Sequence, residues 1–259
     1  MTRLERLIFV TAVSGALLVT AVGAQAPPPS GTSGPGTVRA VLASTPLASL
    51  ADAPRYFKLL RVHLPAKQTT IYNGPVGFVL VLDGSLDVTS GADQWSVAKG
   101  DGALVAASKN TIFKSASSKS VEFLHFVLST AGELNAPMES HPAVIEELYR
   151  TASPIPGLKP GPYEFTLVHV TLPPHFPVNP PHRRSGAALY YIWSGTGMFT
   201  TAGNTTARRA GMVHYEPYDL VHQWANPGDE PLVLIQANIN QEGVPAVMFV
   251  QPAGAGASK

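Results

Sequence analysis

The chain contains no cysteine among its 259 residues. It therefore cannot form a disulfide, hold zinc through thiolates, use a thiol nucleophile or carry the lipid of a lipoprotein. An oxidising compartment would add no covalent cross-link to its fold.

Charged residues are scarce, at 14 %, and nearly balanced, so the formal net charge is only +1. This balance excludes the electrostatic footprint of a nucleic-acid-binding protein. The apolar share of 45 % is ordinary for a globular protein and disfavours both disorder and a polytopic membrane protein. The chain also has no phosphate-binding glycine loop and no Gly-x-Ser-x-Gly nucleophile motif.

Residues 1–24 have the three parts of a secretory signal peptide. Arg3 and Arg6 supply positive charge, Leu7 to Val22 is an uncharged apolar stretch, and small residues lead up to Ala24. We predict cleavage after Ala24 and a secreted or periplasmic protein with no stable membrane span. An uncleaved anchor is the alternative, although sixteen residues are short for a span.

Two parts of the remaining chain repeat each other at an offset of 108 to 111 residues. In both copies, short β-rich runs are separated by glycine, asparagine, aspartate and serine, which predicts an all-β barrel or sandwich. A period near 110 residues is too long for a solenoid and predicts two copies of one domain. The matching pairs are Leu59–Pro65 with Leu167–Pro173, Gly84 with Gly195, Gly100 with Gly211, and Val121–Leu128 with Leu232–Ile239.

One stretch of the second copy has a distinctive spacing. Gly211, Pro217, Asp219, His222 and Asn226 follow the pattern Gly-x5-Pro-x-Asp-x2-His-x3-Asn. This pattern resembles the second motif of the cupin family, except that Asp219 stands where the family has glycine. The resemblance implies an all-β chain of two tandem cupin barrels, of the double-stranded β-helix or jelly-roll type, with degenerate metal-binding motifs.

The domain organisation follows from these patterns. After a Pro/Gly/Ser-rich linker over residues 25–40, we predict an N-terminal degenerate barrel over 41–134 and a C-terminal barrel over 163–252, with a short tail behind it. Residues 135–162 form the predicted inter-domain linker. Within it, Ser140 as a cap and proline in a first turn predict a short helix from Pro142 to Arg150.

The resemblance also implies a four-ligand metal site, which must be carried over residue by residue. In the second copy, counting back from Gly195 places His182 at the first histidine position, Arg184 at the second and Ala188 at the glutamate position, while His222 keeps the last. Only two of the four ligands therefore remain.

The first copy keeps none of the four ligands. The same counting places Ile71, Asn73 and Gly77 at the first motif, and Thr111 at the histidine of the second motif. We expect this half to pack against the second barrel or to contribute to a homodimer.

One interpretation is that the second barrel holds an anion instead of a cation. Arg184 would grip a carboxylate bidentately, because a guanidinium offers only donors and stays charged. His182 and His222 would donate further hydrogen bonds. Strand alternation places Ala188 and Tyr190 on one face, and the phenol of Tyr190 would join the site if that face lines the barrel.

A second interpretation keeps a divalent transition metal as cofactor, bound by His182 and His222 and completed by Asp219, His175 or Gln236. Asp219 has two other interpretations: it tolerates the left-handed turn of the family glycine, or it pairs with Arg184. The third interpretation of the barrel is that it has no small-molecule site.

We therefore expect a secreted bicupin whose C-terminal barrel binds a small polar or anionic, carboxylate-like molecule. The first alternative is a metal-dependent dioxygenase, isomerase or lyase that uses His182 and His222. The second is a non-catalytic structural protein. No nucleic-acid partner is expected.

Overall fold

The computed structural model describes residues 36–137 and 139–250, apart from the side chains of residues 108 and 109. The predicted signal peptide, most of the 25–40 linker and the C-terminal tail lie outside the described residues. Within the described part, strands are joined by loops and one 3-10 helix, η1 (Ala131–Glu133). That part contains no helix with the length and apolarity needed to cross a membrane.

The strands form two similar sets. The first set contains β2 (Arg55–Leu64), β3 (Thr69–Gly74), β4 (Gly77–Asp83), β5 (Ser85–Ser90), β6 (Asp93–Ala98), β7 (Gly102–Val105), β8 (Ser108–Ser115) and β9 (Val121–Thr130). The second contains β11 (Tyr163–Leu172), β12 (His182–Arg184), β13 (Ala187–Ser194), β14 (Thr196–Thr201), β15 (Asn204–Arg209), β16 (Val213–Glu216), β17 (His222–Ala225), β18 (Leu232–Gln241) and β19 (Val247–Phe249).

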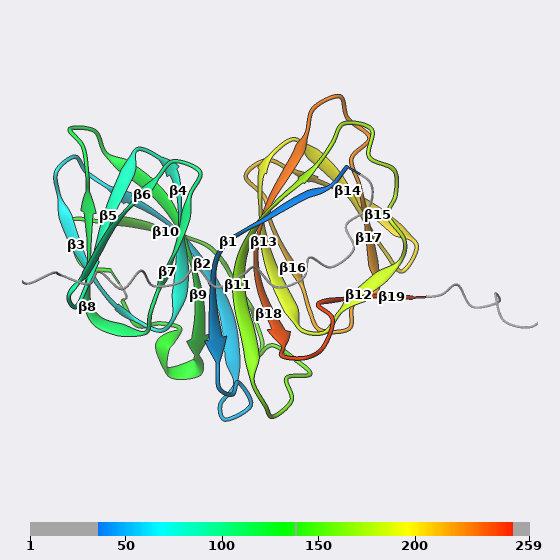
Figure 1. Cartoon of the computed structure of the whole chain (residues 1–259), viewed down its shortest axis with the longest axis horizontal. Helices are drawn as coiled ribbons and strands as arrows, with labels where there is room; N and C mark the ends of the chain where they lie inside the picture. Colours follow the sequence, from blue (N-terminus) through cyan, green and yellow to red (C-terminus); the bar gives the residue numbers. More distant parts are fainter. Residues whose placement is uncertain (1–35, 138, 251–259) are drawn as a thin grey trace, which may run out of the picture.

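Each set folds into a barrel made of two sheets (Figure 1). Two further strands, β1 (Val38–Leu47) and β10 (Val144–Arg150), complete the sheets. The strand orders β10-β2-β9-β4-β7 and β3-β8-β5-β6 build the first barrel, and β1-β11-β18-β13-β16 and β15-β14-β17-β12-β19 build the second. This confirms the predicted all-β class of two tandem jelly-roll barrels.

The paired glycines occupy equivalent turns, as the sequence repeat requires. Gly84 and Gly195 have φ angles of 81° and 80°, and Gly100 and Gly211 have 91° and 84°. At Gly84 and Gly195 a Cβ would also lie 2.6 Å from a backbone carbonyl oxygen, so glycine is needed there for space as well as for conformation.

The two barrels exchange their outermost strands: the strand that precedes the first half in the sequence joins the second barrel, and the strand that precedes the second half joins the first barrel. β1 (Val38–Leu47) pairs antiparallel with β11 of the second barrel, and β10 (Val144–Arg150) pairs antiparallel with β2 of the first. Figure 1 shows β1 running from the junction of the barrels up to the second one. The boundary predicted at residue 41 therefore cuts through a strand, and that strand belongs to the C-terminal barrel.

The helix predicted from Pro142 to Arg150 is wrong, because this segment forms β10. The register of the pairing explains the outcome: Glu146 lies opposite Arg61, with 3.0 Å between carboxylate and guanidinium, and Glu147 reaches Lys58 at 3.4 Å. These contacts to β2 are available only to an extended chain, and tertiary context outweighs local helix signals.

Alternation along the strands divides the apolar residues into three cores. Odd-numbered residues of β2 such as Phe57 and Leu59 point between the barrels, whereas even-numbered residues such as Leu60 and Val62 point into the first barrel. The core between the barrels joins side chains of both halves, among them Phe126 and Leu167. The halves are therefore fused across one continuous apolar interface.

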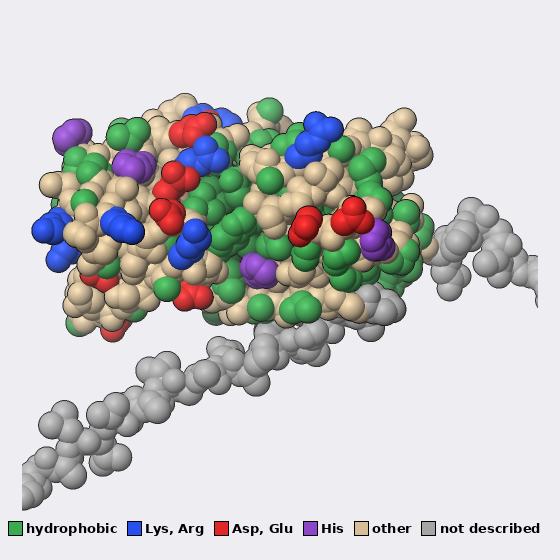
Figure 2. All heavy atoms as spheres, turned by 90° about the horizontal axis from the view of Figure 1, so that it is seen from above, with side chains coloured by type: hydrophobic (Ala, Val, Ile, Leu, Met, Phe, Trp, Pro, Cys, Tyr) green, Lys and Arg blue, Asp and Glu red, His purple; other side chains and the backbone are tan. Residues whose placement is uncertain are grey.

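The surface carries mixed charge. On the face shown in Figure 2, acidic and basic side chains are interspersed, and no large area of one sign is visible there. This agrees with the balanced composition of the chain.

Candidate functional site

The two histidines that the motifs select lie together inside the second barrel. His182 on β12 is directly opposite His222 on β17, and their ring centroids are 4.3 Å apart. Both residues are buried. The Nδ1 of each ring lies 2.9 Å from a backbone carbonyl, of Pro180 and Leu220 respectively, which fixes the orientation of both rings. The predicted convergence of His182 and His222 is confirmed.

The centre of the polar cluster is Glu216, a residue that the motif analysis did not select. Its side chain is fully buried at the end of β16. The Oε2 atom accepts hydrogen bonds from Arg184 Nε at 2.6 Å and from the Tyr190 hydroxyl at 2.5 Å. The Oε1 atom accepts one from Trp224 Nε1 at 2.9 Å and lies 3.1 Å from His222 Nε2. Three hydrogen bonds from within the protein thus hold both oxygens of this carboxylate.

The charges of this cluster are tightly coupled. Burial alone would raise the pKa of Glu216, but the positive charge of Arg184 and the contact with His222 outweigh it and hold the pKa well below its ordinary range. Burial also raises the pKa of Tyr190 well above its ordinary value, so its phenol stays protonated and donates. Arg184 and Glu216 therefore form a buried ion pair that is neutral overall.

These residues do not fit the metal site that the resemblance implies. The guanidinium of Arg184 is 2.6 Å from Glu216, the carboxylate that contacts His222, and a fixed positive charge opposes a cation there. No group of three or more histidine, cysteine, aspartate or glutamate side chains within residues 36–137 and 139–250 has an arrangement that could hold a metal. Two imidazoles alone are an incomplete ligand set.

Two of the three residues proposed to complete the metal site lie elsewhere. Asp219 is half-exposed, has a φ of 65° and pairs with Arg183 at 2.8 Å instead of with Arg184. It therefore adopts the left-handed turn that its position requires, and the predicted ligand role is wrong. The ligand role predicted for His175 is also wrong, because its ring is 70 % exposed and lies 3.2 Å from Asp229.

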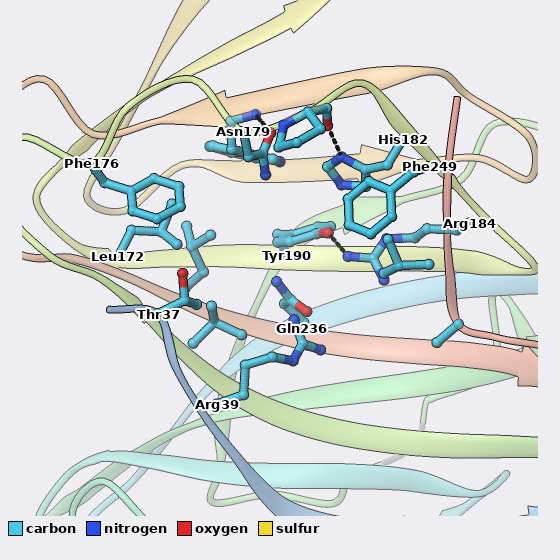
Figure 3. Close-up of a pocket in the computed structure, with 16 residues that line it drawn as sticks. Thr37, Arg39, Leu172, Phe176, Asn179, His182, Arg184, Tyr190, Gln236 and Phe249 are labelled. Atoms are coloured by element: carbon cyan, nitrogen blue, oxygen red, sulfur yellow. Dashed lines mark hydrogen bonds between the residues drawn. The ribbon is translucent and has the colours of Figure 1, made fainter. Parts of the chain in front are cut away.

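A cavity of about 320 Å³ opens beside this cluster within the second barrel. Figure 3 shows its labelled residues: Leu172 and Phe176 lie at one end, and His182 and Arg184 at the other. Its remaining walls are mostly apolar. The complete lining is Thr37, Arg39, Val170, Leu172, Phe176, Asn179, Pro180, His182, Arg184, Tyr190, Trp224, Leu234, Gln236, Ala246, Val247 and Phe249.

Sequence analysis also missed Arg39, which enters the cavity from β1. It lies opposite Val170 in the sheet register, and its half-buried side chain approaches Gln236 (Figure 3). Burial and the nearby charge of Arg184 lower the pKa of Arg39 from its ordinary value. Gln236, the third residue proposed as a metal ligand, is buried, and its Oε1 has no hydrogen-bond partner.

His182 lines the cavity as a neutral base. Burial, followed by the nearby His222, lowers its pKa to about 4, so its ring is uncharged at neutral pH. Because Nδ1 faces the Pro180 carbonyl and donates to it, Nε2 carries a lone pair and accepts hydrogen bonds. In this state His182 therefore presents an acceptor to the cavity, and donation to an anion would require protonation of Nε2. His222 does not line the cavity, since its Nε2 faces Glu216.

The first barrel differs at each of these positions. Thr111 lies opposite Tyr72, so Tyr72 and not Ile71 is the structural counterpart of His182. This one-residue shift turns Ile71 outward, where it is 39 % exposed. The interior contains aromatic rings among mostly aliphatic side chains, with Tyr72 packed on His125 at 4.6 Å between ring centroids.

Comparisons with known proteins agree with this architecture. Residues 168–237, about a quarter of the chain, match the family model of the cupin domain. A tryptophan-to-tyrosine variant of oxalate decarboxylase from Bacillus subtilis has a TM-score of 0.54 and 15 % identity, over 79 % of this chain and 79 % of that chain. AerE from Microcystis aeruginosa has a TM-score of 0.51 and 14 % identity, over 78 % of this chain and 99 % of that one. Both likenesses show the fold alone. No curated protein sequence matches the chain.

Proposed function

We propose that this chain, a pair of cupin-type barrels, binds a small organic anion inside its C-terminal barrel. One observation carries the proposal: two arginines line the cavity, while the only carboxylate in contact with either of them within the described chain is Glu216, which is paired with Arg184 and held by Tyr190 and Trp224. The cavity therefore has one positive charge more than the protein neutralises, and an anion would supply the missing charge.

The metal-dependent enzyme is not favoured by the donor set. His182 is the one of the two motif histidines that lines the cavity, and the permanently charged guanidinium of Arg184 lines it as well. The purely structural interpretation suits the first barrel, whose interior is a cluster of packed apolar side chains, better than the second.

Thermal unfolding of the purified protein, at constant ionic strength, tests the proposal. A panel of organic anions is compared with chloride and with neutral amides of the same shape. A ligand at 100 times its Kd should stabilise the protein by about 2.7 kcal/mol. If no organic anion at millimolar concentration raises the melting temperature above chloride, the proposal is wrong.

Metal content is the matched control. Elemental analysis of protein purified without a metal-affinity tag or chelator should find far less than one metal ion per chain. A stoichiometric metal would favour the metal-dependent alternative.

We also propose export of this protein, on the basis of the signal-like sequence of residues 1–24. Expression in a bacterial host, fractionation and N-terminal sequencing should give a periplasmic or secreted product that begins at Gln25. A cytoplasmic product that keeps its leader would contradict export.

A further inference from the structure

Arg39 is the one arginine of the cavity that has no carboxylate of its own. Among the described residues, no hydrogen bond or ion pair joins Arg39 to another side chain, whereas Arg184 is held by Glu216 and Tyr190. A half-buried guanidinium without a counter-charge is costly to desolvate. The surplus charge of the cavity therefore resides on Arg39.

The sheet register places Arg39 on the floor of the cavity beside a second unsatisfied group. Arg39 lies opposite Val170, and Val170 lies opposite Leu234. Two residues farther along β18, Gln236 lies opposite Tyr190. Figure 3 shows these two side chains directed toward each other. The unpartnered atom of Gln236 is its amide oxygen, which accepts from a donor such as the guanidinium, so only the amide nitrogen can donate to an anion.

The first barrel shows that this pair is a local feature of the second. In the equivalent strand pairing, Ile145 lies opposite Val62, so isoleucine stands at the position of Arg39. At the repeat offset of 111, His125 stands at the position of Gln236, and it is bound to Glu139 at 2.6 Å. The same strand pairing forms in the first barrel without an arginine at this position, so the β-sheet itself does not require Arg39.

The remainder of the cavity restricts the body of the ligand. Away from the guanidinium groups the walls are mostly apolar, with Val170, Leu172, Phe176 and Leu234, and the polar side chains there, Thr37 and Asn179, are uncharged. A second carboxylate placed there would lose its hydration without gaining a cationic partner. An apolar body would instead bury its surface against these side chains.

We propose that the cavity takes a hydrophobic monocarboxylate, with its carboxylate held by Arg39 and Gln236 and its apolar body against Leu172 and Phe176. This inference rests on the proposed binding function of the C-terminal barrel and deepens it. The guanidinium donates two hydrogen bonds in a fork that matches a carboxylate, and the amide nitrogen of Gln236 donates to one of the same oxygens. Arg39 then determines specificity, although it lies upstream of the first barrel in the sequence.

Calorimetric titration with four probes tests the inference. Benzoate and cyclohexanecarboxylate are the apolar carboxylates, benzamide is the uncharged analogue, and malonate is the polar dianion. We expect both apolar carboxylates to bind at least tenfold more tightly than benzamide or malonate. Arg39→Gln should weaken their binding tenfold or more, and Arg39→Lys, which keeps the charge but not the fork, should weaken it less.

Arg183→Gln is the matched control, because Arg183 belongs to the same barrel but pairs with Asp219 at the surface. It should leave binding unchanged, and circular dichroism should show native folding of all three variants. Because the comparison of benzoate with benzamide uses the unaltered protein, it remains decisive even if Arg39→Gln fails to fold.

The outcomes separate the inference from the proposed function. If anions bind equally well to the unaltered protein and to Arg39→Gln, or if malonate binds best, the barrel binds anions but the inference is overturned. If none of the anions binds at millimolar concentration, the proposed function itself fails. Tight binding of the apolar carboxylates that requires Arg39 supports both.

Discussion

Removing the buried carboxylate Glu216 should strongly destabilise the second barrel. In Glu216→Gln the shape of the side chain is kept, but the buried guanidinium of Arg184 loses its counter-charge. The two charged groups are 2.6 Å apart, so their attraction is about 6 kcal/mol at an effective dielectric of about 20. The cost of removing both charged groups from water when the protein folds offsets part of this attraction. Breaking a buried pair from one side costs about 3–5 kcal/mol, which is a large fraction of the stability of a typical domain.

Urea unfolding followed by circular dichroism at pH 7 measures this cost. Arg183→Gln is the control, since its ion pair with Asp219 is half-exposed and should contribute about 0–1 kcal/mol. The double variant Arg184→Met, Glu216→Gln should be destabilised by clearly less than the sum of its single variants, because it leaves no buried charge unpaired. A loss within about 1 kcal/mol of that control, or strictly additive single variants, would refute the ion-pair reasoning.

The buried histidines, the motif positions and the core between the barrels lead to three further predictions. Burial holds the pKa of both His182 and His214 at about 4, against an ordinary 6.5, so as pH drops from 6.5 to 4 the unfolded chain takes up protons first and the free energy of unfolding should fall. Urea unfolding midpoints at each pH measure this fall. His182→Asn should make the dependence of the midpoint on pH less steep, and an unchanged dependence would contradict the prediction. The double variant Arg184→His, Ala188→Glu should bind Mn²⁺ or Ni²⁺ in calorimetry, whereas the unaltered protein should not. Equal metal binding by the variant and the unaltered protein would contradict the argument that the charge of Arg184 opposes a cation. Phe126→Ala in the core between the barrels should cost about 3–5 kcal/mol and still give one unfolding transition, whereas two separate transitions would show that the barrels unfold independently.

The overall architecture could be predicted because it depends on local, repeated signals. The turn glycines need positive φ or close backbone approach wherever the motif occurs, so their spacing survives even though the two copies share few other residues. Alternation of apolar residues then assigns a face to each strand. At His182 and His222, the motif spacing was sufficient to predict that two residues 40 positions apart meet.

The edge strands could not be predicted in the same way. The pairing of β1 with β11, and of β10 with β2, links segments more than 80 residues apart through the backbone. Backbone pairing leaves little trace in residue type at an edge, where one side of the strand is solvent-exposed. Arg39 was consequently assigned to a linker, and Pro142 to Arg150 to a helix.

Glu216 was missed for a different reason, although a signal for it existed. It stands directly before Pro217 of the recognised motif, on the same face of β16 as the buried His214, and at the repeat offset its counterpart is Val105. A charged residue at a position where the other copy has valine indicates a polar interior. Comparing the two copies position by position, and not only at the motif residues, would have found it.

The arrangement around Arg184 places a permanent positive charge in a barrel that keeps only half of the metal ligands that the resemblance implies. In the site that the resemblance implies, a bound cation supplies the positive charge. Here the guanidinium lies next to the two histidines and draws Glu216 to itself, so this charge is covalently attached and does not depend on metal supply. Because Glu216 cancels it, a second cation is needed to attract an anion, and β1 supplies it with Arg39. If the C-terminal barrel binds an anion as proposed, its selectivity depends on a strand that precedes the N-terminal barrel in the sequence. Deleting β1, or replacing Arg39, should abolish that selectivity while leaving the Arg184–Glu216 pair in place.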